Sequence, residues 1–103
     1  MNREELKLLW NKKGLDCRMS ITPAYAVEVC DDCSIPFDKS LIYTKDRYRE
    51  QSDGRPRVDC EDLLIFLCEK LNILPDKEHL EFSNKMFGEG SRRDIVEEAY
   101  LGR

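Results

Sequence analysis

The residues from Leu63 to Cys68 form an uninterrupted apolar run, Leu-Leu-Ile-Phe-Leu-Cys, in a chain of which 37% of the residues are charged. Asp59 precedes the run as a candidate N-cap, and Glu61 and Asp62 place carboxylates in the first turn, where the helix dipole favours them. The pattern predicts a helix over 59–73 that is apolar on every side. Such a helix lies at the centre of its own domain or packs against a partner on the side that its domain leaves open.

The N-terminal half combines one predicted helix with segments in which apolar residues recur at the spacing of a strand. Asn2 is a candidate cap for a helix through about Lys13, and Gly14 is placed to end it. Apolar and polar residues then alternate as in half-buried strands, with Pro23 ending or kinking the first segment. These predicted strands cover residues 15–21, 24–29 and 41–48. The stretch from Gln51 to Arg57, which contains Asp-Gly and Pro, predicts a connecting loop.

Two more helices are expected after the apolar one. The first runs over about 76–87 and would end at Gly88-Glu89-Gly90, and the second begins near Ser91 and presents an apolar face through Tyr100. Leu, Ile, Val and Phe make up 26 of the 103 residues, which is enough apolar material for a core. We therefore expect a single α+β domain over 1–103. It would contain an N-terminal helix, two or three short antiparallel strands and a C-terminal cluster of three helices.

Charge is unevenly distributed along the chain, whose net charge is −4. Residues 39–57 contain six bases and three acids, whereas residues 59–100 contain eleven acids and five bases. The net negative charge disfavours a dedicated binder of nucleic acid or of a membrane surface, since both are polyanionic. The longest apolar run has six residues, and the N-terminus lacks a signal-peptide core, so we expect a cytoplasmic protein with no membrane partner.

The five cysteines leave two interpretations open. Cys30-x-x-Cys33 supplies half of a tetrahedral zinc site, which Cys17 and Cys60 could complete. The alternative is that the cysteines are small buried thiols, which we favour because several carboxylates adjoin the candidate ligands and would disfavour a further negative centre. A redox role for the same pair is disfavoured, since it requires a thiol of low pKa and a following helix. Zinc is thus the only cofactor that the sequence suggests.

Catalytic motifs are absent from the sequence. His79 is the only histidine and lies among charged residues, and there is neither a P-loop nor a GxGxxG motif. We therefore expect that the protein is not an enzyme.

Nucleic-acid binding is the alternative function. Tyr43 and Tyr48 interleave with basic residues that could neutralise phosphates while the aromatic rings stack on bases. The basic candidates are Lys45, Arg47, Arg49, Arg55 and Arg57. The three C-terminal helices could also form a variant of the helix-turn-helix motif.

The last forty-odd residues, with the sequences LCEKLNILP and IVEEAYL, resemble in helix pattern the small phage-encoded transcription accessory factors that bind RNA polymerase. The strand-rich first half departs from that pattern. The resemblance implies a role in transcription regulation and transfers no site residue.

The function that we expect is that of a small adaptor or regulatory protein that binds another protein. The apolar helix and the acidic helical half favour it, since specificity in such binding comes from a buried apolar anchor and rapid association from complementary charge. The candidate anchors are Phe66, Phe82 and Tyr100. Pairing with a second copy of the chain stays open.

Overall fold

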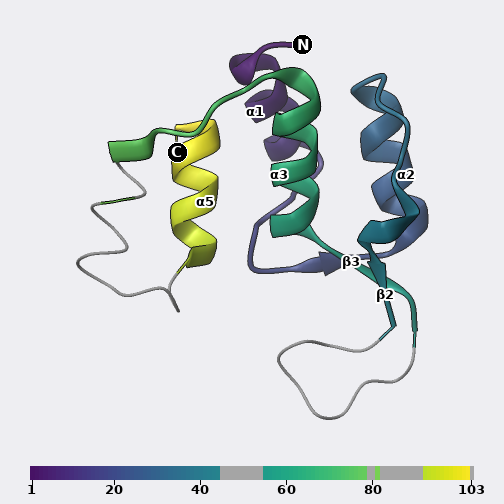
Figure 1. Ribbon diagram of the computed structural model, residues 1–103. Helices are drawn as coiled ribbons and strands as arrows, with labels where there is room; N and C mark the ends of the chain where they lie inside the picture. Colours follow the sequence, from purple (N-terminus) through teal and green to yellow (C-terminus); the bar gives the residue numbers. More distant parts are fainter. Residues whose placement is uncertain (45–54, 79–80, 82–91, 103) are drawn as a thin grey trace.

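The computed structural model describes residues 1–44, 55–78, 81 and 92–102. Its elements are α1 (Arg3–Lys12), β1 (Ser20–Ile21), α2 (Pro23–Asp32), the 3-10 helix η1 (Lys39–Leu41), β2 (Ile42–Tyr43), β3 (Arg57–Asp59), α3 (Cys60–Leu71) and α5 (Arg92–Leu101). In Figure 1, α3 stands between α5 and α2, and the short strands lie at its base. The predicted α+β fold, with an N-terminal helix, a small antiparallel sheet and C-terminal helices, is confirmed.

Helix α1 begins and ends as the sequence predicts. The Asn2 side chain accepts a hydrogen bond from the Glu5 amide at 2.9 Å, and the Glu5 carboxylate accepts one from the Asn2 amide at 3.2 Å. This reciprocal pair satisfies two amides that would otherwise lack a partner. Gly14 then adopts a φ of +68°, a left-handed conformation that stops the helix. Leu6 and Trp10 are fully buried and anchor α1 on the core.

The sheet has three strands in the order β1-β3-β2, and both pairs are antiparallel. Strand β3 is central, although the sequence predicts a loop up to Arg57. Val58 pairs with Ile21 on one side and with Ile42 on the other, and the two remaining pairs are Asp59 with Ser20 and Arg57 with Tyr43. The predicted strands over 15–21 and 41–48 are shorter than expected. Only Ser20–Ile21 and Ile42–Tyr43 form strands, and residues 45–48 lie outside the described residues.

The predicted strand over 24–29 is wrong, because this stretch belongs to helix α2. Pro23 begins the helix instead of ending a strand, since a first-turn residue needs no N–H of its own. The Thr22 hydroxyl accepts a hydrogen bond from the Tyr25 amide at 3.2 Å and so caps the helix. Its buried residues, Ala26, Val29 and Cys30, are spaced by three and by one, as on one helical face.

Helix α3 is the central element, as its apolar sequence predicts. Its fully buried residues are Cys60, Leu63, Leu64, Leu67 and Cys68. Asn72 ends the helix with a φ of +57°. Helix α5 packs against both α1 and α3. Of the helix predicted over 76–87, residues 77, 78 and 81 are helical, and most of the rest lies outside the described residues.

A buried carboxylate connects the last helix to the segment between α1 and β1. Glu97 on α5 is 6% exposed, and its Oε2 atom accepts a hydrogen bond from the Cys17 amide at 3.2 Å. The bond holds the segment before β1 against the last helix. Among the described helices, none is long enough and apolar enough to cross a membrane.

Candidate functional site

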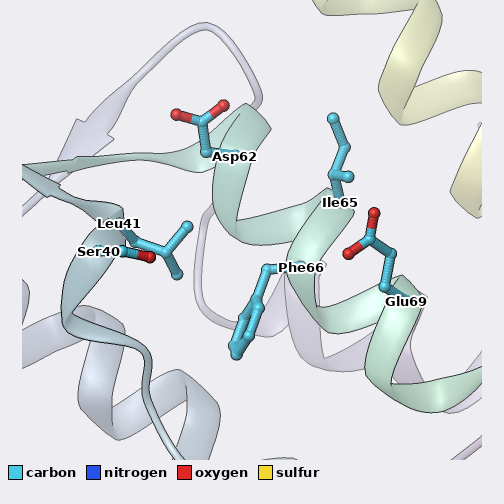
Figure 2. A pocket seen from close by; sticks show the side chains of 6 residues that line it. All are labelled: Ser40, Leu41, Asp62, Ile65, Phe66 and Glu69. Carbon is cyan, nitrogen blue, oxygen red and sulfur yellow. The ribbon is translucent and has the colours of Figure 1, made fainter.

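The outward side of α3 carries a shallow depression of about 340 Å³, which Figure 2 shows from close by. Ile65 and Phe66 line it and are only partly covered, in contrast to the buried residues on the opposite side of the helix. We call this depression the α3 groove. It is lined by Ser40, Leu41, Asp62, Ile65, Phe66 and Glu69.

Two elements form the walls of the α3 groove. Asp62, Ile65, Phe66 and Glu69 follow one another at helical spacing on α3, so they form one stripe along the helix. The other wall comes from η1, and Figure 2 shows the Leu41 side chain reaching toward α3. Because both walls carry aliphatic or aromatic carbon, the groove can receive apolar side chains.

The η1 wall is held in place by a local hydrogen bond. The Asp38 carboxylate caps η1 by accepting a hydrogen bond from the Ser40 amide at 2.9 Å. Hydrogen bonds from the Ser40 amide and from its side chain lower the pKa of Asp38, and the nearby Lys70 ammonium group lowers it further. Asp38 is therefore ionised at neutral pH and contributes negative charge near the groove.

The charged groups at the groove are mainly acidic. Asp62 is partly buried and Glu69 is exposed, and the two stand near opposite ends of the stripe on α3. Lys39 on η1 and Lys70 on α3 are the nearby cations, and the Lys70 Nζ atom lies 5.8 Å from the centroid of the Phe66 ring. A cation at this distance from a ring is attracted by the ring quadrupole. The groove therefore combines apolar walls with an acidic border.

The structure places the three predicted anchors differently. Phe66 lines the α3 groove, although it is also partly buried and packs against the core. Tyr100 on α5 packs against the core in the same way, and its burial raises the pKa of its hydroxyl. Phe82 lies outside the described residues. Of the three anchors, Phe66 is thus the residue found at a surface depression, and Leu41, Ile65 and Glu69 are neighbours that the sequence did not single out.

The five cysteines are free, buried thiols. Cys17 interacts electrostatically with Cys60, and Cys33 interacts with both Cys30 and Cys68. Within the described part of the chain, which includes all four predicted zinc ligands, no three His, Cys, Asp or Glu residues form a group that could hold a metal ion. The zinc hypothesis therefore finds no support in the geometry.

The thiols are also kept protonated at neutral pH. Burial raises the pKa of Cys30 to about 11, and it raises the pKa of Cys60 and of Cys68 to about 12. Cys30 and Cys33 lie at the C-terminal end of α2, where the helix dipole disfavours a thiolate. Reactive cysteines and metal ligands are thiolates, so these environments suit core residues better.

The basic residues of the predicted nucleic-acid site are only partly described. Arg57 donates from Nε to the Ser20 hydroxyl at 3.1 Å and from Nη2 to the Ser20 carbonyl at 2.6 Å. Its guanidinium group thus fastens β1 to β3. Arg55 is exposed, and Lys45, Arg47 and Arg49 lie outside the described residues, as does the segment 82–91 needed for a helix-turn-helix motif.

A second depression, of about 350 Å³, lies beside the C-terminal end of α1, β1 and the start of α2. Lys13 lines it, and its Nζ atom lies 2.9 Å from Glu28 Oε1 and 3.0 Å from Asp32 Oδ2. Hydrogen bonds to these two carboxylates raise the pKa of Lys13. Its ammonium group therefore serves to join α1 to α2. Glu28 and Asp32 stand four residues apart, a signal that becomes readable only once α2 is known to be a helix.

Comparison with known proteins finds no match. No family model, no curated protein and no solved structure is significantly similar to this chain. The resemblance of the last forty residues to transcription accessory factors is therefore without support.

Proposed function

We propose that this protein is a non-enzymatic adaptor or regulator that binds another protein through the α3 groove. The observation that carries the proposal is the partial exposure of two large apolar side chains, Ile65 and Phe66, on the side of α3 that faces away from its buried residues. Covering these side chains removes more apolar surface from water, which is the main driving force in protein association. Phe66 is then the central anchor.

The setting of these residues fits a binding surface. Interfaces commonly place an aromatic or aliphatic anchor at their centre and polar groups at their edge. Here Phe66 and Leu41 supply the apolar centre, and Asp62 and Glu69 supply charge that would steer a complementary partner. We propose further that the protein works in the cytosol, because its five cysteines are free thiols, as is usual in a reducing compartment.

Site-specific photo-crosslinking tests the proposal. The full chain carries p-benzoylphenylalanine in place of Ser40, which is exposed and lines the α3 groove. A control carries the same group in place of Leu8, which is 70% exposed on α1. After irradiation in the native host, we expect a discrete adduct from position 40 and none of the same mass from position 8. The adduct should weaken when Glu69→Lys is added and persist when Glu78→Lys, an exposed control, is added instead.

Three outcomes would overturn the proposal. The first is the same set of adducts from positions 40 and 8, and the second is no discrete adduct from position 40. The third is an adduct of twice the mass of the chain as the only product, which would replace a foreign partner by self-association.

A further inference from the structure

The shape and charge of the α3 groove indicate a specific class of partner. Resting on the function proposed above, we propose that the occupant of the α3 groove is a basic amphipathic helix. Its apolar face would contact Leu41, Ile65 and Phe66, and its Lys or Arg side chains would lie next to Asp62 and Glu69.

The length of the groove matches two turns of helix. Asp62 and Glu69 are seven residues apart on α3, which corresponds to roughly 10 Å along the helix axis. A partner helix lying along this stripe would present apolar side chains at positions i, i+3 and i+4 and cations about two turns apart. Interdigitation of side chains along two such surfaces is the usual way in which helices pack.

An extended partner is disfavoured by the backbone that borders the groove. A peptide that adds a strand needs an edge of unpaired backbone N–H and C=O groups. The long wall of the groove is a helix interior, whose N–H and C=O groups bond within α3 itself. Recognition at this wall has to come from side chains, which favours the packing of a helix in the groove.

The charge of the groove determines the charge of the partner. At or beside the groove, the three acids Asp38, Asp62 and Glu69 outnumber the two bases Lys39 and Lys70 among the described residues, and the chain as a whole carries −4. A partner with acidic residues at the same positions would meet like charges, which lowers its affinity and slows its association. Positive residues on either side of an apolar stripe are therefore the complementary pattern.

Three synthetic peptides of equal length test this inference. The first is an alanine-based helix with a Leu stripe and Lys residues seven positions apart. The second has Glu in place of each Lys, and the third has the composition of the first but two central Pro residues in place of Ala. Each is titrated into the full ¹⁵N-labelled chain, and the shifts of the amide resonances are followed. We expect saturable shifts at residues 40–41 and 62–69 with the first peptide only.

Matched variants of the protein isolate the charge contribution. The double variant Asp62→Asn, Glu69→Gln keeps side-chain size and should weaken binding of the first peptide about tenfold at low ionic strength. The difference should shrink in 0.5 M salt, because exposed charges are screened. Glu78→Gln, at an exposed position outside the groove, should leave the affinity unchanged.

The outcomes separate this inference from the proposed function. Equal binding of the Pro-containing peptide, equal binding of the Glu peptide, or shifts confined to other parts of the chain would each overturn the basic helix as occupant. If position 40 still yields a discrete adduct in the host, the groove binds a partner of another class. If position 40 yields none, docking at the groove fails as a whole.

Discussion

Mild alkali should destabilise this protein strongly, because folding holds its thiols in the protonated form. In the folded chain the pKa of Cys30 is about 11, and the pKa values of Cys60 and Cys68 are about 12, against an ordinary value of 9.0. Below pH 9 a thiol is protonated in both the folded and the unfolded chain, so its ionisation does not lower the stability of the folded state. As pH rises toward the folded pKa, only the unfolded chain releases its protons, so stability is lost.

The size of the loss follows from these values. At pH 10 each unfolded thiol is about 90% ionised, which lowers the free energy of the unfolded state by roughly 1.4 kcal/mol per thiol. The three thiols named above therefore account for about 4 kcal/mol, and burial shifts Cys17 and Cys33 in the same direction. Since a small domain is stable by about 5–15 kcal/mol, this is a large part of the whole.

Urea unfolding at pH 8, 9 and 10 under reducing conditions measures the effect. Trp10 is the only tryptophan and is fully buried, so its fluorescence reports the transition. We expect the free energy of unfolding to fall by about 4 kcal/mol or more between pH 8 and pH 10. Measurement stops at pH 10 because lysine side chains with the ordinary pKa of about 10.4 lose most of their protons above it, which would add a second cause of pH dependence.

A single-cysteine variant provides the control. Cys68→Ala lowers stability at every pH by leaving a cavity, but it should reduce the difference between pH 8 and pH 10 by about 1.4 kcal/mol. A free energy of unfolding that stays constant from pH 8 to pH 10 would refute the reasoning. So would a variant that shows the same difference as the parent chain.

Two further predictions concern elements that the sequence alone misjudged. Arg57→Lys removes the paired hydrogen bonds to Ser20 and should lower the free energy of unfolding, measured in urea, by about 1–2 kcal/mol. An unchanged free energy of unfolding would contradict the role of Arg57 in fastening β1 to β3. Thr22→Ala removes the cap of α2 and should lower the free energy of unfolding by about 1 kcal/mol, whereas Thr22→Ser should lower it much less because it keeps the hydroxyl. Equal losses for the two variants would contradict the capping role.

The elements predicted correctly are those with local signals. Asn2 with Glu5 caps α1, Gly14 ends it, and the apolar run places α3 at the centre. Residues 24–29 were mispredicted because Tyr25, Val27 and Val29 also fit a period of two. In the structure Val27 is 37% exposed, and the buried set is spaced as on a helix. Thr22-Pro23 was the local signal for a helix start that outweighs this alternation.

Strand β3 could not be predicted, because its three residues form a strand only through pairing with partners far away in the chain. Val58 pairs with Ile21 and Ile42, and neither partner is a sequence neighbour. Strand formation depends on such non-local pairing, whereas a helix bonds within its own segment. The same limit applies to the candidate site, since the sequence indicated Phe66 but gave no reason to place Leu41 opposite it.

Apolar content, the central helix, the acidic character of the C-terminal half and the chemistry of the side chains available for binding follow from the amino-acid sequence alone. Composition and the spacing of apolar residues are local features of the sequence, so they are visible before the tertiary structure is known. Packing decides which side of α3 stays open, because α5 and β3 contact one part of the helix, and a depression lies between another part and η1. It also decided that the five thiols are buried, and with that their protonation, because solvent exclusion depends on all the elements that surround a residue.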